Sequence, residues 1–505
     1  MNIRLCFNAT HLTDYAVMDL GDGSTAVDRA VRYAQELSPD DGVTVFASGE
    51  RRLNLPETWE VIQRESWSEQ ALLEQMSSGS GQAETVIYAP LDAPFLSNEI
   101  TSRMLELHTR YRAEYTFADG YPAGMAPELF APSIFSALAD LARRDDAPPV
   151  REGLFRVVQR DINAFDVETE LSRVDLRLLR LSLWCDTRRN YLLCVRLAKQ
   201  CGADTGCLLD QAGRQEVLRT LPAYVSIQLV EGDSQDVIYD PWRHGRGAGK
   251  AWAVPPLGMA GREMEVSRFS ELVAAVEKFA PSSMLHISLR GEIGLHSAAP
   301  ELIRTALRHD LLDTVVETSG VGWKDDHLAV LTEAGFERAR WIVDLDASDE
   351  TVYQGVRGNG FQEAMNFTES LMSAHPSRVY VQAVRMAQTE EHLEQFYRSW
   401  KKRTDNVIIQ KYDHSCGRLA DRRVTDISPV KRFPCWHLKR DVSILLDGSV
   451  VMCREDLERA HAAGNVFSDG IERVWERLEP LYQAHVREEY PALCRNCDEY
   501  YTYNY

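Results

Sequence analysis

The residues best suited to chemistry are four cysteines late in the 505-residue chain. Cys435 precedes Gly448 and Cys453, and the Cys-x-x-Cys pair Cys494 and Cys497 follows. The run VSILLDGSVVMC predicts a β-hairpin with an Asp-Gly turn, which brings the first two cysteines to one end of the structure. Four thiolates bind tetrahedral zinc or an iron–sulfur cluster, and spacing leaves both open. Alternatively, all four are small buried hydrophobes, since free cysteine is commonly buried.

The other cysteines lack such a pattern. Residues 171–202 predict a partly amphipathic helix, and Cys194 and Cys201 share one face of it. We interpret the mid-chain cysteines as core packing, with a displaced cluster or redox role as the alternative; they are Cys185, Cys194, Cys201 and Cys207. Cys416 is isolated in a predicted loop, and we interpret it as structural or neutral.

Composition limits the class of protein. A hydrophobic fraction of 44% and a charged fraction of 26% exclude a wholly disordered or fibrous chain. The net charge of −20 argues against a general nucleic-acid footprint. We expect no membrane association, because no apolar run reaches the roughly 18–20 residues that span a bilayer. The N-terminus lacks a signal-peptide pattern, so we expect a cytoplasmic protein, in which paired cysteines more often bind metal than form disulfides.

Two series of alternating strands and helices must position these residues. In the first, IRLCFNA, GVTVFAS and TVIYAPL predict buried strands of a mostly parallel sheet. The second begins near Tyr224 and predicts six strands: YVSIQLV, MLHISLR, TVVETSG, RWIVDLD, RVYVQAVRM and NVIIQKY. Six βα units predict a partial α/β barrel, whose chemistry belongs at the C-terminal ends of the strands.

These patterns divide the chain into four parts. We expect an α/β domain over 1–185, a helical linker over 186–220, a (β/α)6 barrel over 221–428 and a cysteine-bearing tail over 429–505.

The tail resembles the SPASM domain, which follows the core of many radical S-adenosylmethionine (radical SAM) enzymes and holds auxiliary [4Fe–4S] clusters. The likeness lies in PCWHLKRDVSILLDGSVVMC (434–453), GNV (464–466), Trp475 and CRNC (494–497). Fuller SPASM domains carry further cysteines and hold two clusters. Here DEYYTYNY follows instead, so the resemblance implies one auxiliary cluster on Cys435, Cys453, Cys494 and Cys497, with zinc as the alternative.

The barrel region resembles the radical SAM core. LRGEIGLH (289–296) looks like the Gly-Glu motif after the second strand, which implies that Gly291 and Glu292 contact the amino group of S-adenosylmethionine. VETSG (316–320) and the segment 344–361, with Arg357 in its Arg-Gly turn, are similar to the turns after the third and fourth strands. The arrangement as a whole resembles the spiro-SPASM proteins, in which a nucleotidyltransferase-like domain comes first.

The core motif itself is missing. A radical SAM core needs Cys-x-x-x-Cys-x-x-Cys after its first strand, and the aligned positions here are Asp233, Val237 and Asp240. Hard carboxylates are poor substitutes for thiolates in a low-potential cluster, and valine is no ligand. Residues 208–415 contain no cysteine, so a shifted register does not restore the motif. Enzymatic activity is therefore uncertain.

The N-terminal domain resembles nucleotidyltransferases of the glycosyltransferase-A type. APLDAPFLSNEI (89–100) is similar to their metal-binding segment, with Asp92 as the metal-holding residue. The segment FNATHLTDYA lacks the glycines and basic residue that cradle a triphosphate, so we expect no transfer chemistry. The stretch HGRGAGKAW (244–252) departs from a phosphate-loop motif at its first and last positions, and we interpret it as a loop.

We expect an iron–sulfur protein of radical SAM/SPASM type with a degenerate core that does not cleave S-adenosylmethionine. It would bind a peptide, protein or small molecule, and S-adenosylmethionine binding stays open. The alternatives are an active radical SAM enzyme that modifies a peptide or small molecule, and an N-terminal nucleotidyltransferase.

Overall fold

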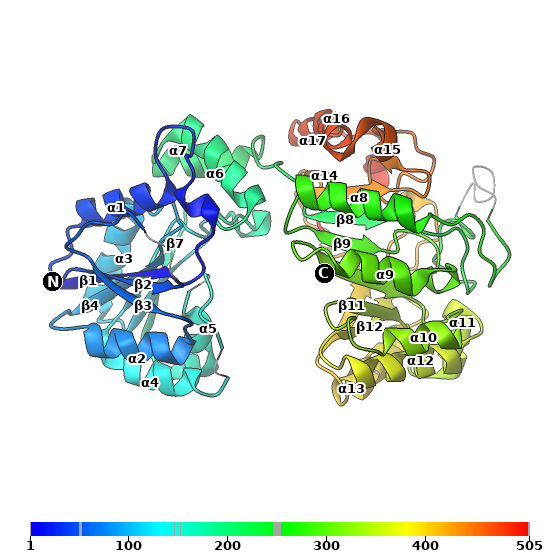
Figure 1. The fold of residues 1–505 in the computed structure, drawn as a ribbon, viewed down its shortest axis with the longest axis horizontal. Helices are drawn as coiled ribbons and strands as arrows, with labels where there is room; N and C mark the ends of the chain where they lie inside the picture. The colour runs from blue at the N-terminus through cyan, green and yellow to red at the C-terminus, as the bar shows by residue number, and fades with distance from the viewer. Residues whose placement is uncertain (1, 50–52, 146, 152, 246–253, 503–505) are drawn as a thin grey trace. The chain divides into compact units, whose positions relative to one another are not determined.

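The computed structural model describes residues 2–49, 53–145, 147–151, 153–245 and 254–502. Most of the stretch 244–252 therefore lies outside the described residues. The chain forms two compact units, Met1–Thr220 and Leu221–Tyr505, coloured blue to green and green to red in Figure 1. None of the described helices is both long and apolar enough to cross a bilayer.

Unit 1 contains a seven-stranded sheet in the order β3-β2-β1-β4-β6-β5-β7. Its pairings are parallel except those of β6, which runs antiparallel to β4 and β5. The strands are β1 (Ile3–Ala9), β2 (Val43–Ser48), β3 (Glu60–Arg64), β4 (Thr85–Pro90), β5 (Tyr115–Asp119), β6 (Glu128–Phe130) and β7 (Val167–Leu171). The helices are α1 (Ala26–Leu37), α2 (Glu69–Gly79), α3 (Asn98–Tyr111), α4 (Phe135–Ala142), α5 (Phe155–Val158), α6 (Arg188–Cys201) and α7 (Thr205–Arg214).

Helices bury both faces of this sheet. Along β1, Leu5 and Phe7 belong to one core, whereas Cys6 belongs to the core of the opposite face. Successive strand side chains point to opposite faces, which explains the continuous apolar runs of the central strands. The predicted parallel α/β sheet is confirmed.

Residues 186–220 pack with unit 1. The apolar faces of α6 and α7 join the same core as β1, through residues such as Leu197 and Leu208. The predicted helix over 171–202 is wrong in its first half, because β7 ends at Leu171 and α6 begins after the N-cap Thr187. The intervening segment instead forms backbone hydrogen bonds with other parts of unit 1; for example, Leu183 N donates to Ala123 O.

The four mid-chain cysteines fall into two pairs with different environments. Cys185 and Cys194 are buried in this core, as predicted. Cys201 packs against the edge of this core, but it also forms a disulfide with Cys207, which joins the end of α6 to the start of α7 and which the core-packing interpretation did not include. The short turn between the two helices brings these sulfurs together, which their positions along the chain did not indicate.

Unit 2 contains a nine-stranded sheet in the order β13-β12-β11-β10-β9-β8-β14-β15-β16. The strands are β8 (Tyr224–Ile227), β9 (Met284–Ile287), β10 (Asp313–Thr318), β11 (Arg340–Asp344), β12 (Val379–Arg385), β13 (Val407–Lys411), β14 (Asp441–Ile444), β15 (Ser449–Val451) and β16 (Gly464–Asn465). All six predicted barrel strands, β8 to β13, are present and parallel, which confirms a partial (β/α)6 barrel.

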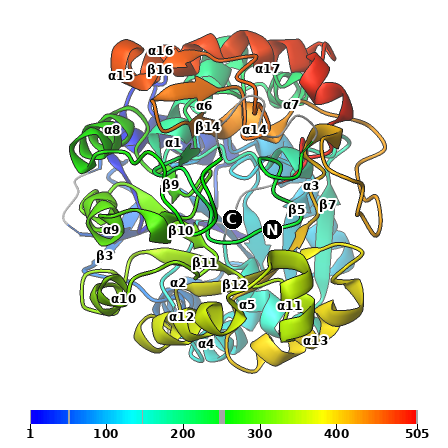
Figure 2. The same cartoon turned by 90° about the vertical axis from the view of Figure 1, so that its right-hand side faces the viewer.

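Helices lie on the outer side of this curved sheet (Figure 2). Those of the barrel are α8 (Val266–Phe279), α9 (Ala299–Leu307), α10 (Asp325–Leu331), α11 (Glu350–Arg357), α12 (Phe361–Ala374) and α13 (Glu390–Lys401). Those of the tail are α14 (Trp436–Arg440), α15 (Val466–Asp469), α16 (Ile471–Arg477) and α17 (Glu479–Val486). The tail shares the barrel's sheet, because β14 pairs in parallel with β8.

We expect the apolar face of α8 to hold unit 2 together. Leu272 on α8 is 3% exposed within the main core of this unit. Leu272→Ala should lower the free energy of unfolding by about 2–5 kcal/mol, because it removes buried methyl groups and leaves a cavity. Glu271→Ala, on the exposed side of the same helix, is the control and should change it by less than about 0.5 kcal/mol. Urea unfolding followed by circular dichroism measures both; equal effects would contradict the assigned core.

Candidate ligand pocket and metal centre

The inner side of the unit 2 sheet encloses a cavity of about 360 Å³. Side chains from β8 through β14 line it together with the loops that follow the parallel strands. Polar members of this lining include Ser226, His286, Glu317, Asp344 and Gln382. The cavity therefore lies where the strand pattern predicted the site, on the inside of the barrel near the C-terminal strand ends.

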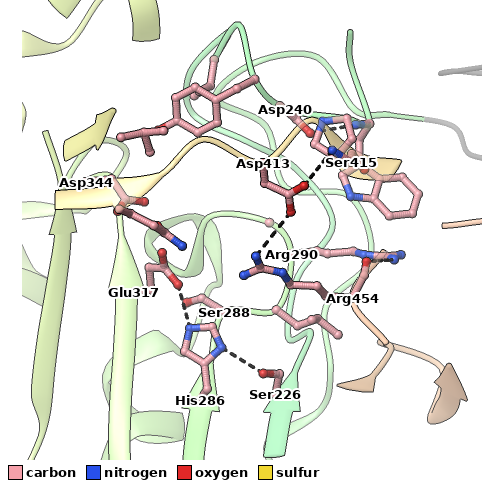
Figure 3. Close-up of a pocket in the computed structure, with 18 of the residues that line it drawn as sticks. Ser226, Asp240, His286, Ser288, Arg290, Glu317, Asp344, Asp413, Ser415 and Arg454 are labelled. Atoms are coloured by element: carbon pink, nitrogen blue, oxygen red, sulfur yellow. Dashed lines mark hydrogen bonds and ion pairs between the residues drawn. The ribbon is translucent and has the colours of Figure 1, made fainter. Parts of the chain in front are cut away.

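A chain of hydrogen bonds crosses the floor of this cavity. Ser226 and His286 are direct neighbours in the β8–β9 register, and their side chains lie 3.2 Å apart between Oγ and Nδ1. His286 Nε2 lies 2.9 Å from Glu317 Oε2 (Figure 3). Gln382 Nε2 then donates to both Glu317 and Asp344. Neighbouring strands thus contribute a continuous polar belt.

Two carboxyl groups in the belt have opposite pKa shifts. Burial by itself would raise the pKa of Glu317. The hydrogen bond from His286 and the charge of that imidazole outweigh burial, so the pKa of Glu317 lies below its usual value. Burial and the negative charge of Glu317 raise the pKa of Asp344 well above its usual range. Asp344 therefore takes up a proton more readily than Glu317 does.

The loop after β8 carries Asp233, Val237 and Asp240, the three positions at which the sequence resemblance would place core cysteines. Arg243 Nε donates to Asp233 Oδ2 at 3.1 Å, and Asp240 Oδ1 accepts from Trp242 N at 2.8 Å. Both carboxylates and Val237 line the cavity. Burial and the neighbouring Asp233 raise the pKa of Asp240 to about 6. The Arg243–Asp233 ion pair and the hydrogen bond from Trp242 N to the Asp240 side chain therefore hold this loop in place.

Arg357 lies at the same cavity, but its guanidinium is already bonded. It donates from Nε to Gln235 at 3.1 Å and from Nη1 to Tyr239 at 2.8 Å. It also makes a buried ion pair with Asp346 at 2.7 Å. Arg357 therefore fixes the loop after β8 against the end of β11.

Glu292 is likewise engaged within the protein. Its Oε1 accepts from Gly294 N and Thr318 Oγ1, and its Oε2 accepts from the backbone N and the hydroxyl of Ser319. These four bonds join the turn after β9 to the end of β10. All four hydrogen bonds of the Glu292 carboxylate are therefore made to other residues of the chain. Gly291 and Glu292 both border the cavity.

The predicted hairpin is present in the tail. Strands β14 and β15 pair antiparallel, with Ser443 opposite Val451. Gly448 sits in the turn with φ +87°, and a Cβ there would lie 2.2 Å from the ring of Phe467. Glycine is therefore required at this turn.

The four tail cysteines lie around one small cavity. Cys435 is the N-cap of α14, Cys453 follows β15, and Cys494 lies in a 3-10 helix, Ala492–Asn496, that ends at Cys497. Burial raises the pKa of the Cys494 thiol to about 12. Four sulfurs from three separate segments, two of them on buried cysteines and two on partly buried ones, suit a metal centre, which would favour the thiolate forms.

A fifth cysteine lines this cavity, contrary to the expectation that Cys416 is isolated. Its thiol hydrogen-bonds to Cys497. Ser415 and Cys416 both have positive φ, and Ser415 Oγ donates to Glu455 at 2.6 Å, which ties this turn to the segment after Cys453. No spacing rule links Cys416 to the tail, so only the folded chain reveals the proximity.

The cysteine cavity and the barrel cavity adjoin. Four residues line both: His437, Cys453, Arg454 and Glu455. Arg454 also donates to Asp413 and Glu499, at 3.3 and 3.0 Å. A centre held by the cysteines would therefore sit beside anything bound in the barrel.

In unit 1, an arginine covers the residue expected to hold a metal. Asp92 is 1% exposed, and Arg151 Nε donates to its Oδ2 at 2.8 Å. The same guanidinium donates to the backbone oxygen of His11, in the segment that lacks a phosphate-cradling loop. Burial raises the pKa of Asp92 despite this cation.

Comparisons with known proteins identify part of the chain. Residues 435–498 match the SPASM family, an iron-sulfur cluster-binding domain. Over 365 residues the chain is 36% identical to an uncharacterized protein of Treponema pallidum (strain Nichols), covering 70% of this chain and 98% of that protein.

Two solved structures are similar at low identity. Streptococcus suis SuiB bound to S-adenosylmethionine has 12% identity and a TM-score of 0.44, covering 61% of this chain and 81% of that one. A cytidylyltransferase from Leptospira borgpetersenii serovar Hardjo-bovis has 15% identity and a TM-score of 0.34, covering 43% and 95%. The sequence matches carry the assignment: the chain belongs to the same family as the Treponema pallidum protein, and its residues 435–498 are a SPASM iron–sulfur cluster-binding domain.

Proposed function

We propose that this protein is an iron–sulfur protein whose barrel binds a small polar ligand beside the cluster and does not cleave S-adenosylmethionine. The observation that carries the proposal is the shared wall between the two cavities, formed around Cys453 and Arg454. An enclosed pocket of this volume suits a small molecule better than a protein surface.

We further propose one [4Fe–4S] cluster held by Cys435, Cys453, Cys494 and Cys497. Around a zinc ion, with Zn–S bonds of about 2.3 Å, tetrahedral thiolates lie about 3.8 Å apart. Among the described residues, one group of at least three potential metal ligands has its ligand atoms within 4.8 Å of one another, and it consists of Asp413, His414 and Asp498. No three of the described cysteine sulfurs lie that close together. The wider spread of the sulfurs supports a cluster rather than zinc.

The absence of cleavage follows from the loop after β8. Reduction of S-adenosylmethionine needs a cluster with three protein thiolates and one open iron. Asp233, Val237 and Asp240 occupy those positions, and the neighbouring Glu292 and Arg357 are bonded within the protein. A tail cluster with four cysteine ligands has no open iron to bind the methionine group.

The first prediction concerns metal content. Protein that is purified and reconstituted without oxygen should hold about four iron and four sulfide per chain. The double variant Cys494→Ala/Cys497→Ala should lose both, because two of four ligands are gone. Cys185→Ala, at a cysteine in the core of unit 1, is the matched control and should keep them. Iron unchanged in the double variant contradicts the ligand set, and zinc alone contradicts the cluster.

The second prediction concerns S-adenosylmethionine. Reconstituted protein incubated with dithionite and S-adenosylmethionine should form no 5′-deoxyadenosine, as measured by liquid chromatography. Several turnovers of 5′-deoxyadenosine would show that a reactive cluster exists elsewhere. Cys194 and Cys201 would not explain it simply, because the first is buried in the unit 1 core and the second is in a disulfide.

The third prediction concerns unit 1. The full chain should release no pyrophosphate from nucleoside triphosphates with Mg²⁺, because Arg151 neutralises Asp92 and the phosphate-cradling loop is missing. Asp92→Asn is the control for any background release. Metal-dependent release that disappears in this variant would instead establish a nucleotidyltransferase.

A further inference from the structure

One cation on the wall of the barrel cavity makes no ion pair with the described residues, although Glu455, Asp456 and Cys453 lie within electrostatic range of it. Four Arg or Lys side chains line the cavity, and three of them have a carboxylate within 3.1 Å: Arg357, Lys411 and Arg454. The fourth is Arg290, and none of the carboxylates in the described residues makes an ion pair with it. Arg290 is therefore the one of these four cations without an ion-pair partner among the described residues.

The backbone holds Arg290 in place. It lies in the turn directly after β9, next to Gly291 with φ +79°. A Cβ on Gly291 would lie 2.2 Å from the backbone oxygen of Val230, so the turn passes tightly against the end of β8. The position of Arg290 is thus set by a close backbone approach that only glycine permits.

The side chain is supported on two sides. Its Nη2 donates to the backbone oxygen of Arg454 at 3.2 Å, and its guanidinium lies 3.7 Å from the centre of the Trp242 ring. A guanidinium carries five N–H donors, so most of them remain for another partner. Stacking on an aromatic face leaves N–H groups at the edge of the planar guanidinium free to donate to two oxygens of one anion.

Arg290 is half-buried, and its partial desolvation makes this arrangement less favourable without an anion. Desolvation lowers the pKa of Arg290 to about 9, even though Glu455 contributes some opposing charge. A buried charge without a partner is costly, and a bound carboxylate or phosphate would offset that cost.

We propose that Arg290 anchors an anion-binding subsite, which takes a carboxylate or phosphate group of a small polar ligand in the barrel cavity. The inference rests on the proposed ligand-binding function and specifies the ligand's charge. Figure 3 shows Glu317 and Asp344 on the opposite side of the cavity from Arg290. A ligand held at Arg290 would therefore extend hydroxyl or amino groups toward these acids.

The test is a binding measurement on the full chain in a buffer free of both anions. Inorganic phosphate and succinate are titrated separately by calorimetry, which distinguishes the two sources of negative charge. Arg290→Gln should bind the preferred anion about tenfold more weakly or worse, because it removes both charge and fork. Arg290→Lys keeps the charge without the fork and should bind with intermediate affinity.

Arg398→Gln is the matched control, because Arg398 is exposed on α13 and pairs with Glu394. It should bind as the wild type does. Binding of neither anion by the wild type, or equal affinity in Arg290→Gln, overturns the subsite. Iron content and the thermal midpoint are measured on the same samples. Anion binding that depends on Arg290 in protein without iron supports the subsite while contradicting the proposed cluster.

Discussion

The candidate site depends on the parallel pairing of β14 with β8, in which Asp441 lies opposite Tyr224 and Ile444 opposite Ile227. This ladder attaches the tail to the first strand of the barrel. Because β15 returns antiparallel from β14, Cys453 emerges next to the barrel cavity. A tail joined by a flexible linker would leave the distance between cysteines and pocket unspecified. Here the hydrogen bonds of one sheet set it.

A second constraint is the burial of many charged groups inside the barrel. Buried charges are tolerated where they are paired and hydrogen-bonded, and the cavity wall follows this rule closely. Glu292 has four donors, Arg357 has Asp346 and two neutral partners, and Arg454 bridges Asp413 and Glu499. Against this background, an unpaired Arg290 is a local exception, and such exceptions are where ligands are found.

Each unit holds an internal ion pair at a position that the sequence resemblance singled out. In unit 1, Arg151 supplies the positive charge beside Asp92 that a divalent metal would otherwise supply. In unit 2, Arg243 pairs with Asp233, in the loop where thiolates would hold a cluster. In both places an arginine of the chain itself neutralises the carboxylate.

The amino-acid sequence by itself determined the parallel sheets, the six barrel strands and the hairpin between Cys435 and Cys453. It also shows that residues 208–415, which include Asp233, Val237 and Asp240, contain no cysteine. These features depend on local periodicity, turn residues and short spacings, which can be recognised within a single segment of the sequence. The tertiary structure alone decided the place of Cys416 beside Cys497, the Cys201–Cys207 disulfide, the Arg151 cover on Asp92 and the unpaired Arg290. Each of these features depends on segments that come together only when the chain folds. Whether a charged side chain has an ion-pair partner therefore depends on the tertiary structure and not on either segment alone.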